Sequence, residues 1–131
     1  MSELVDRVVV LDAEDEAACP RLPIVDGDGE ARAIVWPGMG ARHRSMHRVR
    51  LGAGARTVTL RHSGEAVWYV VEGDGSVTDE DSGESQKIIT GSMVHIGPGD
   101  GYRLVAGDGE MRLAGGPCPP DPALYAHLDN A

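Results

Sequence analysis

The chain has 131 residues and a net charge of −9, with 18 glycines, eight prolines and two cysteines. Its length predicts one domain with its own core, and its acidic charge argues against nucleic acid as a partner, because phosphate binding needs a basic surface. No stretch approaches the roughly 20 apolar residues of a membrane-spanning helix, and the N-terminus lacks a signal-peptide layout. We therefore expect a cytoplasmic protein with no membrane partner, in which Cys19 and Cys118 remain free thiols.

The N-terminal part of the chain predicts short strands joined by loops. Residues 5–11 are a β-prone run suited to a sheet edge, and residues 12–18 are an acidic stretch suited to one helical turn. Prolines and a Gly-Asp-Gly cluster make residues 20–29 a loop, and residues 31–36 read as a strand that a Pro-Gly pair ends.

Residues 40–54 concentrate basic side chains in an otherwise acidic protein, with four arginines and two histidines between positions 42 and 50. Val49 and Leu51 alternate with arginines, so the apolar residues define the inward face of a strand. By the same parity His47 points inward, which makes it a candidate site residue. In the alternative interpretation, the segment is only an arginine-flanked strand whose outer face pairs with surface carboxylates.

Residues 54–75 predict two strands and two turns, around which the rest of the chain is organised. Val58, Leu60 and His62 alternate with polar residues, so one face of the first strand is mostly apolar and has a single histidine. After a Ser-Gly turn, residues 66–71 are mostly β-branched and aromatic, which is typical of a buried strand.

Parity also identifies side chains that should face a cavity. Trp68 shares the parity of Ala66, so its ring should offer a flat apolar wall to a ligand. Val94 has the inward parity in its strand, whereas His95 has the outward parity and is given no role. Short strands are expected at 75–79, 85–89, 93–96, 102–106 and 111–114, and a short helix at 122–128. Regular short strands without a long helical period predict an all-β sandwich or barrel.

Two segments together resemble the paired sequence motifs of the cupins, a family of small β-barrel proteins. Residues 54–73 follow the glycine spacing of the first motif, and residues 91–106 follow the second. The four positions that hold the motifs' histidines and glutamate are occupied here by Leu60, His62, Ala66 and Tyr102. The resemblance implies an all-β fold, a cupin-type antiparallel jelly-roll β-barrel with little helix.

The resemblance covers about residues 44–115, the expected core of a single domain spanning residues 1–131. Residues 1–43 would then form an N-terminal strand and loop, and residues 115–131 a proline-rich tail. The resemblance also implies a homodimer joined through edge strands. The strand at 5–11 is a candidate to cross between subunits, because an uncovered edge favours association.

Most cupins hold one divalent transition metal at these motif positions, but only His62 of the usual ligands remains here. Leucine and alanine offer no lone pair, so the usual centre cannot form. An atypical metal would be held by His62 with Glu65, His47 or Tyr102; otherwise the protein has no cofactor. A bulge in the strand at 66–72 would have to turn Glu65 inward. The run that begins at Glu65 also resembles the ectoine synthases, cupin cyclases with a metal-binding glutamate nearby.

Each of these residues also has a purely structural interpretation. His62 fits a core histidine with satisfied hydrogen bonds, and Glu65 fits a solvated carboxylate beside a turn. Tyr102 fits a plug of the barrel whose hydroxyl finds a partner near the rim.

A cavity with His62, Tyr102, His47 and Glu65 as catalytic groups suits proton transfer, since imidazole titrates near neutrality and a buried tyrosine can donate to a developing oxyanion. The ligand-contacting side chains are expected to be Leu60, Ala66, Trp68 and Val94. We therefore predict a cupin that binds a small metabolite as a metal-free or atypical-metal enzyme of lyase, isomerase or cyclase type. The alternatives are a non-catalytic ligand-binding or sensor cupin and a metal-dependent oxygenase.

Overall fold

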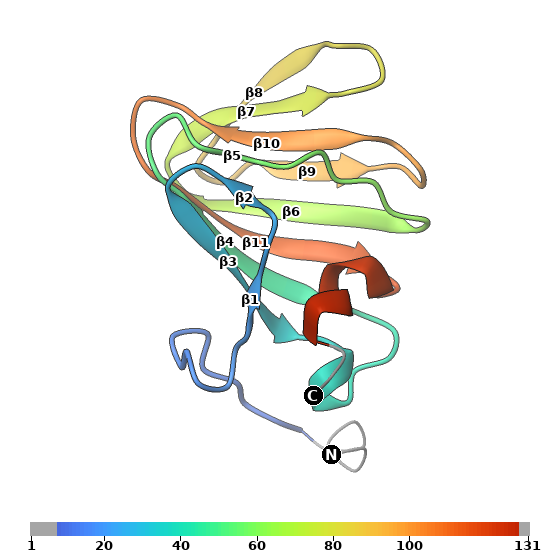
Figure 1. Cartoon of the computed structure of the whole chain (residues 1–131). Helices are drawn as coiled ribbons and strands as arrows, with labels where there is room; N and C mark the ends of the chain where they lie inside the picture. Colours follow the sequence, from blue (N-terminus) through green and yellow to red (C-terminus); the bar gives the residue numbers. More distant parts are fainter. Residues whose placement is uncertain (1–7, 129–131) are drawn as a thin grey trace.

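The computed structural model describes residues 8–128, which fold into two antiparallel β-sheets with short 3-10 helices (Figure 1). The first sheet runs in the order β1 (Arg21–Leu22), β3 (Gly29–Val35), β4 (Met46–Leu51), β11 (Met111–Cys118), β6 (Glu65–Glu72) and β9 (Met93–Ile96). The second sheet runs in the order β2 (Val25–Asp26), β5 (Arg56–Thr57), β10 (Tyr102–Ala106), β7 (Asp74–Asp79) and β8 (Ser85–Ile89). The helices are η2 (Pro37–Met39) and η3 (Pro122–Leu128).

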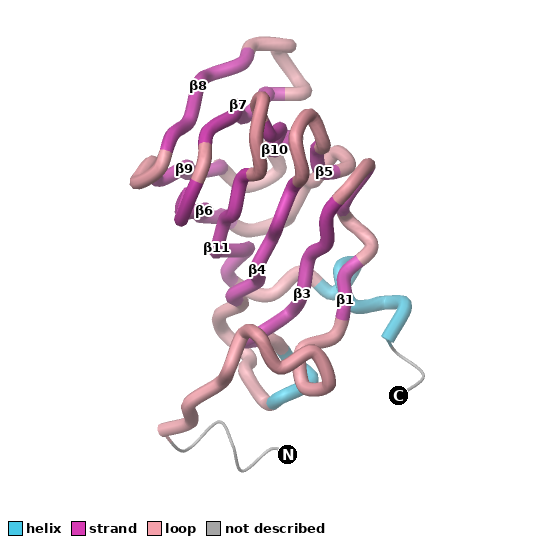
Figure 2. The backbone as a smooth tube through the Cα atoms, turned by 90° about the vertical axis from the view of Figure 1, so that its left-hand side faces the viewer, coloured by secondary structure: helices cyan, strands magenta, loops and turns pink. Residues whose placement is uncertain are grey.

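The predicted all-β jelly roll with little helix is confirmed, with one difference in its closure. Side chains from both sheets form a single core, so the sheets pack face to face. Strands β8 and β9 are edge strands of their respective sheets, so the barrel is open between them. Figure 2 shows β1, β3, β4 and β11 side by side in the first sheet. Within residues 8–128, no helix has the length or apolarity to cross a bilayer.

Most of the predicted elements lie where the sequence pattern places them. Strands β8, β9 and β10 and helix η3 coincide with their predicted ranges, although η3 is a 3-10 helix. Strand β11 extends four residues beyond the predicted end at 114. The strand predicted at 5–11 is not present at residues 8–11, and its first residues lie outside the described part of the chain.

The prediction that Val58 shares one face with Leu60 and His62 is wrong, because the alternation breaks after β5. Thr57 is fully buried, whereas Val58 is 38% exposed and Leu60 is buried again. The Thr57 hydroxyl accepts a hydrogen bond from the backbone N–H of Leu104, which explains the burial of this polar side chain. After this irregularity, Leu60 pairs with Tyr102 in an isolated bridge.

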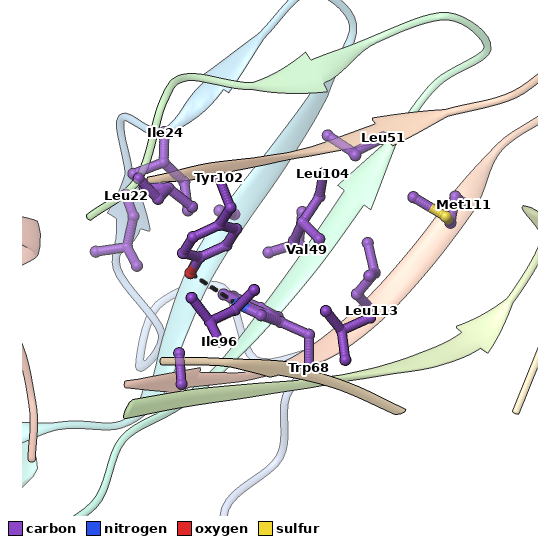
Figure 3. Packing of buried hydrophobic residues seen from close by; sticks show 14 of the residues in the cluster. Leu22, Ile24, Val49, Leu51, Trp68, Ile96, Tyr102, Leu104, Met111 and Leu113 are labelled. Atoms are coloured by element: carbon purple, nitrogen blue, oxygen red, sulfur yellow. Dashed lines mark hydrogen bonds between the residues drawn. The ribbon is translucent and has the colours of Figure 1, made fainter. Parts of the chain in front are cut away.

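Strand β6 places a large aromatic side chain between the two sheets. Ala66, Trp68 and Val70 are buried, as the predicted parity requires. Trp68 and Tyr102 are each only 1% exposed, and their rings meet inside the core beside Leu113 and other apolar residues (Figure 3). The interior that the sequence predicted as a ligand cavity is therefore largely occupied by the protein's own aromatic rings.

Candidate functional site

A chain of hydrogen bonds links four side chains from distant parts of the sequence. The Tyr102 hydroxyl lies 2.9 Å from Trp68 Nε1 and 2.8 Å from His62 Nε2. On its other side, His62 Nδ1 lies 2.7 Å from the Asp121 Oδ2 atom. Strands β6 and β10 thus position the indole and the phenol, and the loop after β5 and the segment before η3 supply the imidazole and the carboxylate. We call this chain the relay.

The chemistry of the four groups fixes the direction of each bond when His62 is neutral. The indole N–H only donates, so the Tyr102 oxygen accepts from Trp68. The single hydroxyl proton of Tyr102 is then donated to His62 Nε2, and His62 Nδ1–H is donated to the Asp121 carboxylate. If His62 gains a proton, Nε2–H donates to the Tyr102 oxygen instead, and the hydroxyl proton becomes available to another acceptor.

Burial keeps Tyr102 in its protonated form. Desolvation raises the pKa of the phenol well above its ordinary value, against the opposing effect of the Trp68 N–H, and the Asp121 carboxylate raises it further. Tyr102 is therefore a phenol near neutral pH, and it becomes a proton acceptor only if its own proton moves to His62. The relay supplies that receiving group.

A second histidine–tyrosine pair lies in the same interior. His47 Nε2 lies 2.6 Å from the Tyr125 hydroxyl, and His47 is 1% exposed. Burial lowers the pKa of His47 to about 4, with a smaller contribution from His62, so the imidazole is neutral near pH 7. An added Cβ at Gly116 would lie 2.8 Å from His47 Nδ1, so the missing side chain makes room for this ring. The predicted inward direction of His47 is confirmed.

Asp121 and Tyr125 are the two residues of this interior that the sequence analysis missed. Both belong to the segment around η3, which Figure 1 shows at one end of the sheets. Asp121 Oδ1 accepts the backbone N–H of Ala123 at the start of η3, while Oδ2 accepts from His62. The Asp-Pro pair that opens a predicted helix was the available signal, since aspartate before an N-terminal proline is a typical helix cap.

The structure places Glu65 on the outer face of β6, so its role as an inward-facing site residue, which depended on a bulge, is wrong, and the solvated carboxylate is the interpretation that fits. Its side chain is 63% exposed, and Oε1 lies 3.8 Å from Nε2 of His95. Burial alternates without interruption from Glu65 along the strand, so the bulge needed to turn it inward is absent there. The irregularity in this pairing lies at the other end, opposite Arg112. His95 faces outward, as predicted.

The residues at the cupin ligand positions do not fit a divalent transition metal. Leu60 and Ala66 are buried there and offer only hydrocarbon. Glu65 points away, so the alternative set with His62, His47 or Tyr102 loses its carboxylate. Across residues 8–128, no three histidine, cysteine, aspartate or glutamate side chains lie close enough to hold a metal ion together.

A pocket of about 320 Å³ enters the molecule between the edge strands β8 and β9. Its inner wall includes Val94, Ile96 and Tyr102, and its rim includes Asp79 and Glu84. Of the predicted ligand contacts, only Val94 lines this pocket. Trp68 and Ala66 are packed in the core, and Leu60 borders a different cavity.

That second cavity of about 230 Å³ lies beside the other end of the relay. His62 and Asp121 border it, together with the exposed side of Val58 and with Leu60. Tyr102 does not border this second cavity, and His62 does not border the first. The relay therefore extends from one cavity to the other.

No protein-family model matches the chain, and no curated protein matches it. Among solved structures, an ectoine synthase from P. lautus is 20% identical with a TM-score of 0.70, covering 93% of this chain and 86% of that one. A protein described as a predicted oxalate decarboxylase from Thermotoga maritima is 18% identical with a TM-score of 0.67, covering 82% and 96%. The polyketide cyclase RemF from Streptomyces resistomycificus is 21% identical with a TM-score of 0.61, covering 91% and 87%. Other matching structures are described as cupins, and the chain therefore has the cupin fold.

Proposed function

We propose that the protein is an enzyme that catalyses proton transfer on a small metabolite, in a reaction of the lyase, isomerase or cyclase type. The observation behind this proposal is the relay, in which His62 connects Tyr102 to Asp121 by hydrogen bonds of 2.8 and 2.7 Å. A hydroxyl or thiol whose proton passes to an imidazole oriented by a carboxylate is the arrangement that catalytic triads use for a nucleophile. Here the group at the front is a phenol.

The relay supports a base step as follows. A proton from the substrate passes to the Tyr102 oxygen while the hydroxyl proton of Tyr102 passes to His62 Nε2. The imidazolium that forms is held by the Asp121 carboxylate at Nδ1, and Tyr102 ends the step as a phenol. The high pKa that burial gives the phenol makes this coupled transfer necessary, because a free phenolate is disfavoured in the core.

The reverse transfer supplies an acid step in the same site. With His62 protonated, Nε2–H donates to the Tyr102 oxygen, and the hydroxyl proton of Tyr102 is free to move to a leaving group or an oxyanion. Removal of one proton and delivery of another completes a dehydration, an isomerisation or a ring closure. No redox step is needed.

The pocket between β8 and β9 is the place where we propose that the substrate binds. Its volume of about 320 Å³ falls at the lower end of the range for small-molecule sites. Val94 and Ile96 give it an apolar inner wall, next to which Tyr102 is the relay residue that borders it. In this proposal Val94 contacts the substrate, as the sequence predicts.

The comparisons support the reaction class only through the fold. Two of the matched structures are described as an ectoine synthase and a polyketide cyclase, so this fold accommodates small-molecule enzymes, one of them a cyclase. At 20 and 21% identity, their substrates cannot be transferred to this chain.

The test is a solvent-exchange assay with matched tyrosine variants. Wild-type protein, Tyr102→Phe and Tyr69→Phe are each incubated in D₂O with a panel of small carbonyl and hydroxy acids, and C–H signals are followed by ¹H NMR. Exchange or turnover of a panel member should be lost in Tyr102→Phe and kept in Tyr69→Phe, because Tyr69 lies half exposed on the outer face of β6. Equal activity of Tyr102→Phe and the wild type would contradict the proposal.

A non-catalytic ligand-binding protein is the second candidate. It is favoured by the fact that both His62 nitrogens already have partners inside the chain, as in a purely structural network. Compounds that bind in the pocket but undergo no exchange in the same assay would select this candidate.

We also propose that the protein works in the cytoplasm. Cys19 and Cys118 are both free thiols, which is the usual state of cysteine in a reducing compartment. Thiol titration of protein taken directly from cells under denaturing conditions should find both thiols reduced.

A further inference from the structure

Tyr102 and Asp121, two members of the relay, border different cavities. Tyr102 borders the pocket between β8 and β9, whereas His62 and Asp121 border the second cavity beside Val58. The His62 side chain is only 3% exposed, whereas the Asp121 side chain is 16% exposed. The carboxylate is therefore the more solvent-exposed of these two groups. A proton on His62 thus has a short path to solvent that does not cross the substrate pocket.

We propose that Asp121 exchanges the relay's proton with water in the second cavity, on the opposite side of His62 from the substrate. This inference rests on the proposed function for its use in catalysis, but the path itself exists in the resting protein. Asp121 acts through His62 and touches no substrate, so it is a positioning and exchange residue.

The transfer balances in protons and charge. After a base step, the His62 imidazolium gives its Nδ1 proton to the Asp121 carboxylate, and the resulting carboxylic acid gives that proton to water in the cavity. His62 is left neutral with its proton on Nε2, where it donates to the Tyr102 oxygen and frees the hydroxyl proton toward the pocket. When a proton from water then returns through Asp121 to Nδ1, the imidazolium restores the acid form of the relay, and no proton has to return through the substrate.

Within residues 8–128, the polar groups near the relay other than Asp121 do not provide another path by which its proton could reach the second cavity. The Trp68 N–H donates to Tyr102 but has no lone pair to accept a proton. His47 bonds Tyr125 rather than any relay member, and its Nδ1 has no hydrogen-bond partner. Arg61, which also borders the second cavity, is bound to Asp81 and to the Gly99 carbonyl and is always charged.

The experiment measures exchange of the His62 ring protons with water, by NMR of protein labelled with ¹⁵N-histidine and without any substrate. Val58→Trp should fill the second cavity and slow exchange of the His62 Nδ1 proton by about tenfold, because solvent then reaches it only by local opening. A ring signal that exchanges too fast to be seen in the wild type should become visible in this variant. Ile89→Trp is the matched control, since Ile89 is exposed on β8 and borders neither cavity.

Asp121→Asn gives a second, independent readout. With its single amide oxygen, asparagine can replace Oδ2 toward Nδ1–H or Oδ1 at the start of η3 but not both, and it cannot accept and release a proton. Exchange should slow in this variant as well. Unchanged exchange in both Val58→Trp and Asp121→Asn would overturn the inference.

The result also separates this inference from the proposed function. Slowed exchange without turnover of any compound would leave the exchange path in place and remove its catalytic use. Turnover that depends on Tyr102, combined with exchange that is insensitive to both variants, would keep the enzyme and exclude this path.

Discussion

Asp121 Oδ2 lies 2.7 Å from His62 Nδ1, although the two residues are 59 positions apart in the sequence. The same carboxylate caps η3 through its other oxygen. One side chain therefore orients the imidazole and fixes the start of the segment that follows the last strand. Because both oxygens are used, changes at this position should affect stability and the relay together.

Replacing Tyr102 by phenylalanine should destabilise the fold by about 1–3 kcal/mol, because the buried Trp68 N–H and His62 Nε2 would both lose their partner. Urea unfolding followed by tryptophan fluorescence measures the change. Tyr69→Phe is the control and should stay within about 0.5 kcal/mol of the wild type, as an exposed site requires. Equal stability of the two variants would show that the Tyr102 hydroxyl does not contribute to the free energy of unfolding.

Asp121→Ala should cost more stability than Asp121→Asn. Alanine removes both the cap of η3 and the acceptor for His62, each of which is worth about 1 kcal/mol. Asparagine has a single acceptor oxygen, so it can keep one of the two hydrogen bonds and should cost less. Thermal unfolding of the two variants side by side measures the difference, and the opposite order would contradict the dual role of the carboxylate.

Stability should fall as the pH drops from about 6.5 toward 4, with His47 as one cause. Its pKa in the folded protein is lowered from 6.5 to about 4, so between these values the unfolded chain binds the proton and the folded chain does not. The free energy of unfolding therefore rises with pH across this window, by up to about 3 kcal/mol from this group. Urea unfolding of wild type and His47→Gln at several pH values tests this, and the slope should flatten in the variant. A slope unchanged by the substitution would assign the effect to other groups.

Protein purified without chelator or added metal should contain far less than one equivalent of any transition metal. The reason is that Leu60 and Ala66 replace ligands at the cupin positions and that Glu65 points outward. Elemental analysis of wild type and His62→Ala gives the answer. About one equivalent in the wild type, lost in His62→Ala, would revive an atypical metal centre.

The homodimer predicted from the cupin resemblance stays a prediction. Val67, Tyr69, Val71 and Met93 are exposed on the outer face of β6 and β9, which makes this face a candidate for the contact. Light scattering after size exclusion should give twice the chain mass of 13.8 kDa for the wild type. A Tyr69→Lys variant should shift toward monomer, and a wild-type protein that is monomeric at all concentrations would exclude the dimer.

Much of the fold was predictable because this sequence keeps the glycine spacing and the apolar alternation of the cupin motifs, although it lacks most of their metal ligands. The inward positions of His47, His62 and Trp68 follow from period-two parity within single strands. Val58 was misplaced because the alternation breaks after β5, where the polar side chain of Thr57 is buried and accepts a hydrogen bond from the Leu104 N–H, which pattern alone does not reveal. Glu65 was assigned an inward position only by assuming a bulge, and the simple alternation was correct.

The site was less predictable, because its partners meet through long-range packing. The sequence singled out His62 and Tyr102 but gave no reason to join either of them to Asp121 or Tyr125, which come from the tail beyond β11. The cavity was expected in the middle of the barrel, yet the rings of Trp68 and Tyr102 fill that space. How large side chains share an interior volume is decided by three-dimensional packing, which strand parity does not specify.

The position of Asp121 and Tyr125 after β11 also bears on how the protein is made. During synthesis, strands β1 to β11 of the described residues 8–128 all precede Asp121 and Tyr125, so the two sheets can begin to pair while His47 and His62 still lack these partners. Docking of the segment from Asp121 to Tyr125 then gives each imidazole its partner from the tail in one late step. We therefore expect a stage of folding in which the strands have begun to pair while both histidines still lack their partners from the tail.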